Sequence, residues 1–139
     1  MKIFLQVFTL AFFFISCMKD EASHITFSGN IKNNSENILK VTNYNSTLKQ
    51  EIAIDSSGNF SGPVAIEDDG YYFFQIGRSY TTVRFKKEHD VNVSIDANDF
   101  YNSMDYSGEL KIENNYNVAK SLLRANLVGD PKEYFVVPL

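Results

Sequence analysis

Apolar and polar residues alternate with a period of two along most of the chain between residues 25 and 108. This spacing is typical of β-strands that bury one face and expose the other. It predicts strands at residues 25–31, 38–44, 48–54, 60–66, 71–76, 81–85 and 91–95. Clusters of Asn, Asp, Ser and Gly separate these segments and favour turns. We therefore expect a mainly β fold, an antiparallel β-sandwich-like domain over residues 25–108.

Four features of the sequence refine this expectation. Residues 55–59, Asp-Ser-Ser-Gly-Asn, predict a tight turn, because the Asp can hydrogen-bond its own backbone and the Gly can adopt a positive φ. Pro63 favours an edge position for its strand, since Pro offers no N–H to a neighbour. Residues 71–76 are almost continuously aromatic or apolar, which predicts a central strand covered on both faces. Residues 100–107 have no clear period, and a short strand near Tyr106 is one interpretation.

The pattern changes after Gly108 and indicates one helix at residues 109–128. The segment contains no Pro or Gly, and its apolar residues recur every three or four positions, as on one face of a helix. That face consists of Ile112, Tyr116, Ala119, Leu122, Leu123 and Leu127. Two shorter helices are the alternative, because Asn114, Asn115 and Asn117 are poor helix formers.

Residues 129–139 form an apolar tail after the predicted helix. Gly129 and Pro131 are typical of a helix end. The last six residues, 134–139, are almost entirely apolar, and an exposed apolar segment favours association. The tail therefore either docks on the domain or marks a truncation point beyond which a longer relative would continue.

The first sixteen residues have the pattern of a secretory signal peptide. Lys2 supplies a positive charge, and residues 3–15 are apolar apart from Gln6 and Thr9. As a helix this core would span about 20 Å, less than the ~30 Å hydrocarbon layer of a bilayer. The sequence that ends in Ser16-Cys17 resembles a lipobox. We expect cleavage before Cys17 and lipid attachment to its sulfur, with an ordinary signal peptide or a membrane anchor as alternatives.

Residues 17–24 are then a lipidated tether that holds the domain at a membrane through its acyl chains. Several chains are needed for stable anchoring, because one chain binds only weakly. Within the tether, Lys19, Asp20 and Glu21 resemble the export signal of surface-exposed lipoproteins of Bacteroidetes, and a solvated linker is the alternative. These features predict a cell-envelope location, as an outer membrane lipoprotein that is periplasmic or surface-exposed.

Charge and cysteine content exclude several classes of function. The chain has 17 acidic and 13 basic residues and a formal net charge of −4, with no basic stripe. This composition argues against binding to nucleic acid or to anionic lipid by charge. Cys17 is the single cysteine, so its acylation would leave no thiol for redox chemistry, nucleophilic catalysis or metal binding.

The remaining candidate residues do not form a recognisable catalytic or metal-binding motif. His24 and His89 lie in a predicted tether and a predicted turn, where we expect solvated polar side chains. The acidic segment 67–69 offers carboxylates to calcium but lacks the alternating spacing of a calcium loop. No phosphate-binding loop, H-E-x-x-H motif or Ser/His/Asp arrangement is recognisable. We expect a protein that is not an enzyme and has no cofactor and no metal.

Tyrosine provides one candidate binding surface. Aromatic rings can stack on a sugar or pack against a partner chain, although most rings in a small domain are needed for its core. The residues considered for a ligand face are Tyr71, Tyr72, Tyr80 and Tyr101.

From about residue 25 to residue 123, the order of short motifs resembles an uncharacterised N-terminal accessory domain. This domain precedes the thioredoxin-like module in TlpA-type thiol–disulfide oxidoreductase lipoproteins of Bacteroidetes. The matching motifs are Phe27-Ser28-Gly29-Asn30-Ile31, Ile54-Asp55-Ser56-Ser57-Gly58-Asn59-Phe60, Tyr71-Tyr72-Phe73, Val91-Asn92-Val93-Ser94-Ile95-Asp96, and Tyr106-Ser107-Gly108 leading to Asn114-Asn115-Tyr116. The resemblance implies an antiparallel β unit followed by a helical connection to the catalytic module.

The catalytic Cys-x-x-Cys of that module is absent from this chain. The resemblance therefore implies a membrane-anchored, non-catalytic accessory or interaction domain, whose partner is a thioredoxin-like protein or module. A cell-surface lipoprotein that binds glycan or peptide is the alternative function.

Overall fold

A computed structural model describes residues 23–128 of the 139-residue chain. The predicted signal peptide, Cys17, the export segment Lys19–Glu21 and the apolar tail at 129–139 lie outside the described residues.

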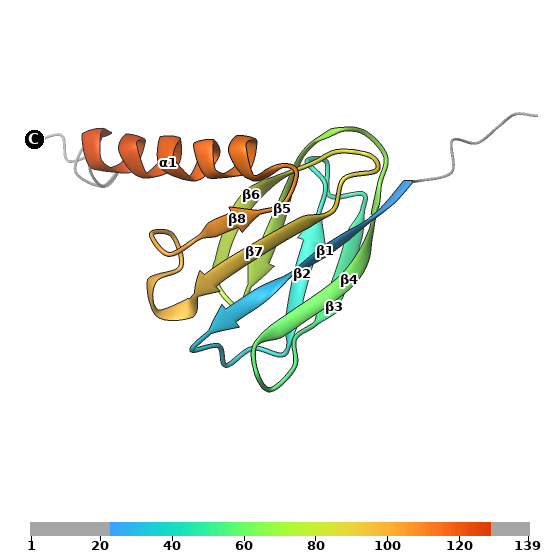
Figure 1. Ribbon diagram of the computed structural model, residues 1–139, viewed down its shortest axis with the longest axis horizontal. Helices are drawn as coiled ribbons and strands as arrows, with labels where there is room; N and C mark the ends of the chain where they lie inside the picture. Colours follow the sequence, from blue (N-terminus) through green and yellow to red (C-terminus); the bar gives the residue numbers. More distant parts are fainter. Residues whose placement is uncertain (1–22, 129–139) are drawn as a thin grey trace, which may run out of the picture.

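The described residues form eight strands, a short 3-10 helix and one α-helix (Figure 1). In chain order these are β1 (Ser23–Lys32), β2 (Ile38–Thr42), β3 (Lys49–Ala53), β4 (Asn59–Ile66), β5 (Gly70–Ile76), β6 (Ser79–Phe85), β7 (Val91–Asp96), η1 (Ala97–Asp99), β8 (Asp105–Ser107) and α1 (Lys111–Val128). The prediction of a mainly β domain with one C-terminal helix is confirmed, and α1 is continuous rather than divided into two pieces.

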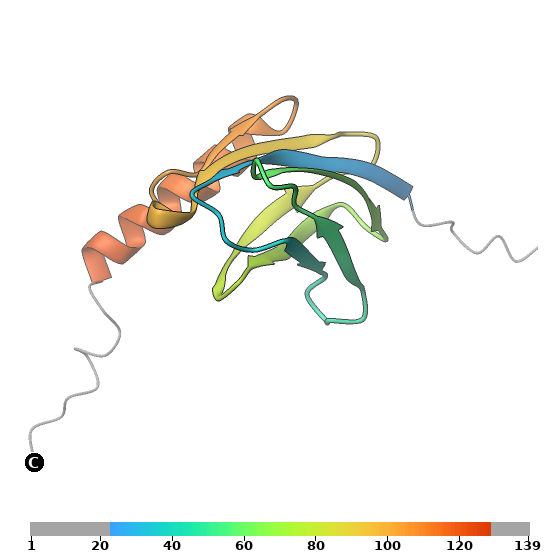
Figure 2. The same ribbon diagram turned by 90° about the horizontal axis from the view of Figure 1, so that it is seen from below.

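The strands form two four-stranded sheets that face each other (Figure 2). One sheet has the order β4-β1-β7-β8 and the other β3-β2-β5-β6. All neighbouring strands are antiparallel except β1 and β7, which pair in parallel with Phe27 opposite Val91. The sequence pattern predicts antiparallel strands and gives no sign of this long-range parallel pair.

The core lies between the two sheets and is built around aromatic rings. Phe27 of β1 is fully buried and contacts Phe60, Phe74 and Phe85 edge to face, with ring centroids 5.1–5.5 Å apart. Edge-to-face pairs stabilise a core beyond the area that they bury, by about 0.5–1.5 kcal/mol each. These rings therefore join strands of both sheets at the centre of the domain.

Two strand predictions have different outcomes. Pro63 lies in β4, which is the edge strand of its sheet next to β1, as expected; on its other side β4 makes one isolated bridge, between Phe60 and Ile54. β5 is indeed internal to its sheet, between β2 and β6, but it is not covered on both faces. Tyr71 and Gln75 are exposed while Tyr72 and Phe74 are buried, because a two-layer sandwich leaves the outer face of each sheet to solvent.

The predicted turn at 55–59 is confirmed. The Asp55 carboxylate accepts hydrogen bonds from the backbone N–H groups of Ser57 (2.8 Å) and Asn59 (2.9 Å). Gly58 has a φ of +81°, and a Cβ at this position would collide with the carbonyl oxygen of Ile31. Only glycine fits both this conformation and this close approach.

The segment between β7 and β8 is held in place by Asp96. Its carboxylate accepts hydrogen bonds from the Asn33 side chain (2.8 Å) and from the backbone N–H of Asn98 (3.0 Å), and its own N–H donates to Ser103 Oγ (2.7 Å). These bonds fix a loop in which Phe100 enters the core, and the short strand predicted near Tyr106 follows as β8. The hydrogen bond from Asn33 contributes most to lowering the pKa of Asp96.

Two consecutive asparagines attach α1 to the sandwich. The Asn114 side chain accepts a hydrogen bond from the backbone N–H of Arg84 in β6 (2.7 Å) and donates one to its C=O (3.2 Å). The Asn115 side chain does the same with Tyr106 in β8, at 2.8 and 3.0 Å. β6 and β8 are edge strands of different sheets. We call this pair of contacts the Asn clamp; it places α1 along the open side of the sandwich (Figure 1).

The clamp turns the apolar face of the helix outward, although the apolar face of a surface helix ordinarily packs on the core. Most residues of the predicted apolar face are exposed, namely Ile112, Tyr116, Ala119, Leu123 and Leu127, and Tyr116 is 65% exposed. The buried face instead contains Asn114, which is 1% exposed, and the partly buried Val118. Apolar periodicity therefore identified the helix correctly but not the side that packs.

The Asn clamp predicts a specific effect of replacing one side-chain nitrogen. Asn114→Asp keeps the shape of the side chain. It removes the N–H that donates to the Arg84 C=O, and it places a negative charge next to that carbonyl oxygen. We expect the free energy of unfolding at neutral pH to fall by about 1–3 kcal/mol, as for an unsatisfied buried group. Urea unfolding of the wild type and the variant measures the difference in the free energy of unfolding.

Asn117→Asp is the matched control, because the Asn117 side chain contacts the Tyr71 hydroxyl near the surface (3.2 Å). It should lose less than about 1 kcal/mol. Equal losses in the two variants would contradict a special role for Asn114.

The lowered pKa of Asp96 predicts a pH-dependent stability. A carboxyl whose pKa is lowered on folding stabilises the fold above its ordinary value of 3.8, and this contribution is lost as the pH falls through the lowered value. Asp96→Asn should therefore be less stable than the wild type at pH 7, and the difference should shrink toward strongly acidic pH.

Urea midpoints measured from pH 2 to 7 test this expectation. Asp68→Asn is the control, since within residues 23–128 its carboxylate accepts no hydrogen bond. A constant difference between Asp96→Asn and the wild type over the whole range would refute the assignment.

Candidate functional site

A groove lies between α1, the edge strand β6 and the loop after η1. It has a volume of about 350 Å³. We call it the α1 groove; its lining residues are Thr81 and Thr82 of β6, Tyr101 and Met104 of the loop, and Asn117, Val118, Ser121, Leu122 and Ala125 of α1. Both the loop and the helix contribute apolar residues to the lining, among them Met104, Val118 and Leu122, so the groove suits an apolar side chain more than a charged one.

The open edge of β6 forms one wall of this groove. In an antiparallel pair, alternate residues direct their backbone N–H and C=O groups away from the neighbouring strand. Arg84 directs its groups to Asn114, and the Tyr80 C=O accepts from the Tyr101 hydroxyl (3.4 Å). Thr82 lies between them with the same orientation, and its backbone groups have no hydrogen-bond partner in the described part of the chain. The groove therefore contains one unpaired position of a strand edge.

A second hollow, of about 290 Å³, adjoins the α1 groove. The two share Thr82, Asn117 and Ser121, and the second is also lined by Tyr71, Lys120 and Arg124. The Arg84 guanidinium lies 5.6 Å from the centre of the Tyr71 ring, a distance that allows a cation–π interaction. The helix thus places two cationic side chains, Lys120 and Arg124, beside the apolar α1 groove.

The four predicted ligand-face tyrosines do not form one surface. Tyr80 is 61% exposed and contacts Tyr101, which is also exposed. Tyr71 is also exposed, and it lines the second hollow. Tyr72 is 4% exposed, and strand alternation directs it into the core, where its hydroxyl donates to the Asp68 C=O (3.0 Å). Tyr72 therefore exposes almost none of its surface to a ligand.

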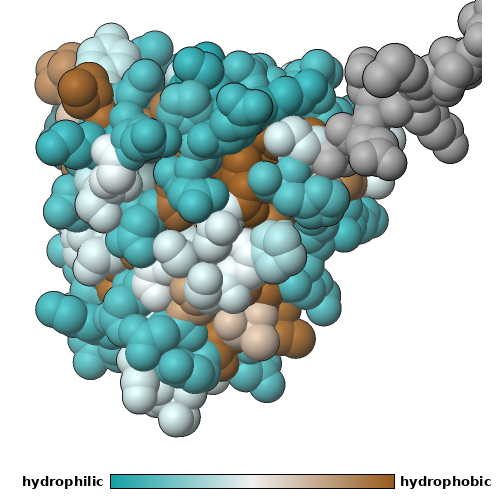
Figure 3. Space-filling model, turned by 45° about the vertical axis from the view of Figure 1, so that its right-hand side comes forward, coloured by the Kyte–Doolittle hydropathy of each residue, from teal (hydrophilic) through white to brown (hydrophobic). Residues whose placement is uncertain are grey.

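Elsewhere the surface is more polar. On the face drawn in Figure 3, hydrophilic residues dominate and hydrophobic ones show only in small separate areas.

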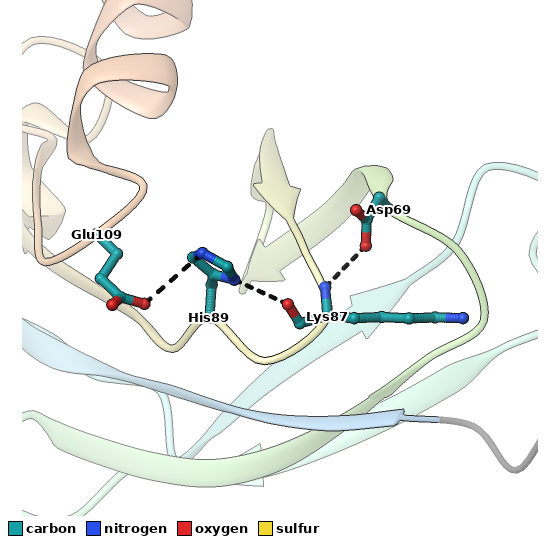
Figure 4. A network of polar contacts seen from close by, with 4 residues as sticks. All are labelled: Asp69, Lys87, His89 and Glu109. Carbon is teal, nitrogen blue, oxygen red and sulfur yellow. Dashed lines mark hydrogen bonds and ion pairs between the residues drawn. The ribbon is translucent and has the colours of Figure 1, made fainter.

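His89 belongs to a polar network at the start of α1 (Figure 4). Its Nδ1 donates to the Lys87 C=O (2.8 Å), and its Nε2 lies 4.0 Å from a carboxylate oxygen of Glu109. Asp69 accepts from the Lys87 N–H (2.8 Å). The network connects the β6–β7 turn to the β4–β5 turn and to the residues before α1, so its hydrogen bonds serve structure.

Neither histidine is placed for metal binding. His24 is exposed on β1. Among residues 23–128 no three His, Cys, Asp or Glu side chains gather in a way that could hold a metal ion.

Tyr106 is the one strongly shifted titratable residue near the clamp. Burial raises the pKa of its phenol, and its hydroxyl has no hydrogen-bond partner among the described residues. The group therefore stays protonated at physiological pH and cannot act as a base.

Sequence reasoning noted Asn114, Asn115 and Asn117 only as poor helix formers. Their position inside an otherwise good helix was the available signal, because Asn in a helix is unfavourable unless its amide has a partner. The partners themselves are backbone groups of distant strands, which no local pattern reveals.

No helix within the described residues has the length and apolar character needed to cross a membrane.

No protein family matches the sequence, and no curated protein does. One solved structure that resembles the chain is a DUF3823 family protein from Parabacteroides merdae ATCC 43184, with 17% sequence identity and a TM-score of 0.38. The match covers 53% of this chain and 46% of that protein, less than half of its length. A similarity of this size does not assign this chain to that family.

Proposed function

We propose that this chain is a non-catalytic interaction domain, held at a membrane by a lipid on Cys17 and accessory to a thioredoxin-like protein or module. The observation that carries the proposal is the exposed apolar stripe of α1. This stripe consists of Ile112, Tyr116, Ala119, Leu123 and Leu127.

The stripe has the physical properties of a binding surface. Its residues follow one another at spacings of three and four, so they line up on one side of the helix. Burying apolar area contributes about 25 cal/mol per Å², and a line of large side chains can supply several kcal/mol. A soluble domain rarely exposes such a row without a partner.

The helix is also held in position before any partner arrives. The Asn clamp fixes its first turns to both sheets, so binding need not order it. A pre-ordered surface loses less conformational entropy on association. This supports a binding role rather than a segment that folds only on contact.

The choice of partner rests on the resemblance to the accessory domain of TlpA-type lipoproteins. In those proteins a helical connection follows the β unit and leads to the thioredoxin-like module. Here α1 follows the β domain in the same order and carries the apolar stripe. We therefore assign the stripe to contact with such a module, supplied by the same or another polypeptide.

A second candidate function is supported by the exposed tyrosines. Tyr80 and Tyr101 are in contact, and both are accessible for stacking against a sugar or a peptide. The two candidates use different surfaces, so one experiment can separate them.

The lipid anchor is tested by metabolic labelling with a palmitate analogue. The wild-type chain should be labelled and recovered with membranes, and Cys17→Ser should be neither, because no other thiol is present. Ser23→Cys in the Cys17→Ser background is the control, because it restores one thiol at a position outside the lipobox-like sequence. Labelling that persists in Cys17→Ser, or that the control restores in full, would refute a signal-directed anchor.

The binding surface is tested by photo-crosslinking in the native cells. A photoreactive phenylalanine analogue at Tyr116 should crosslink to a protein with a thioredoxin-like Cys-x-x-Cys module, and Leu123→Asp in the same chain should abolish the crosslink. The physical reason is that one charge in the stripe opposes its burial.

The same analogue at Tyr80, which is equally exposed, is the matched control. Crosslinks at Tyr80 to a glycan-linked or peptide ligand, with none at Tyr116, would support the second candidate and contradict the first.

A further inference from the structure

We infer that residues 134–139 of this chain dock in the α1 groove and pair with the open edge of β6 at Thr82. This goes beyond the proposed function, because the groove and the apolar stripe lie on opposite sides of α1. Docking of this segment and partner binding at the stripe can therefore be tested separately.

The groove contains one open position of a strand edge. Thr82 lines the groove, and its backbone N–H and C=O point away from β5 and have no partner among residues 23–128. Extended peptides commonly bind an exposed sheet edge through such backbone groups, while nearby pockets receive alternate side chains. Val118, Leu122 and Met104 supply an apolar pocket beside this edge.

The segment 134–139 has the matching composition. Its sequence is Tyr-Phe-Val-Val-Pro-Leu, in which aromatic and β-branched residues favour extended structure. It offers alternate large apolar side chains to a cavity of about 350 Å³. Pro138 lacks an N–H, and a strand that becomes the new edge of a sheet tolerates this.

The connection is long enough to reach the groove. α1 ends at Val128, and the groove extends along the helix from Ala125 back to Asn117. At 1.5 Å per helical residue, Asn117 lies about 16 Å from the helix end. Residues 129–133 can turn the chain, and six extended residues then span about 20 Å.

Charge and covalent connection favour this occupant over another molecule. Lys120 and Arg124 line the adjoining hollow, and two of the three charged residues at 129–133 are acidic, Asp130 and Glu133. A segment joined by a short linker has an effective concentration of about millimolar. A separate peptide would have to compete with it.

The absence of Trp from the sequence gives a clean fluorescence test in the complete chain. Phe135→Trp introduces a single Trp into the segment, and its emission should lie at the short wavelengths of an apolar site. Adding Ala125→Arg to the groove should move the emission to the longer wavelength of a Trp in water. Ala119→Arg, the same substitution about 120° around the same helix and outside the groove, should leave it unchanged.

Hydrogen exchange gives a second readout without Trp. The Thr82 amide should exchange about five- to tenfold faster in Ala125→Arg than in the wild type, the equivalent of one lost hydrogen bond. Ala119→Arg should exchange at the wild-type rate.

Three results would overturn the inference. They are a water-like emission of Phe135→Trp in the parent chain, an equal response to the two arginines, and an emission that depends on protein concentration, which would assign the segment to the groove of a second copy. The crosslink at Tyr116 reports on the opposite side of α1, so its failure would leave this inference intact.

Discussion

The structure depends on satisfying the backbone groups of two strand edges on the same side of the sandwich. β6 and β8 end different sheets, and both leave N–H and C=O groups facing outward there. The Asn side chain carries one amide with both a donor and an acceptor, so it can pair with a strand residue as another peptide group would. Asn114 and Asn115 do this on consecutive residues of one helix, one for each sheet. Four hydrogen bonds outweigh the modest helix propensity cost of two asparagines.

This constraint determines which sides of α1 are available to other molecules. Consecutive residues in a helix lie about 100° apart, so fixing Asn114 and Asn115 against the two edges fixes the rotation of the whole helix. Tyr116 and the other stripe residues are then directed to solvent. Val118 and Leu122 are directed toward β6, where they form the α1 groove. The exposed stripe and the groove are therefore two consequences of one set of hydrogen bonds.

The same reasoning explains which features of this protein could be predicted from sequence patterns and which could not. The strands, the turn at 55–59 and the edge position of Pro63 were predictable, because period-two burial and turn chemistry depend on neighbouring residues. The helix was predictable as an element for the same reason. The orientation of the helix was not predictable. Apolar periodicity assumes that the apolar side of a helix packs on the core, whereas here the hydrogen bonds from Asn114 and Asn115 to the edges of two distant strands determine which side packs.

Tyr72 shows the same limit at the candidate site. Adjacent residues of a strand point to opposite faces of the sheet, and only the position of the second sheet shows which face is inside. The α1 groove combines β6, the loop after η1 and α1, and no short motif in the sequence marks it.

The arrangement of the chain ends relates these surfaces to the proposed anchor. In Figures 1 and 2, β1 begins at one end of the molecule and α1 ends at the other. A tether that enters at Ser23 would therefore hold the domain with the last turns of α1 away from the membrane. The part of the stripe around Leu123 and Leu127 would then be the part most accessible to a partner in the envelope. The Asn clamp fixes the direction of α1 relative to β1, so the separation between Ser23 and the end of α1 follows from the fold.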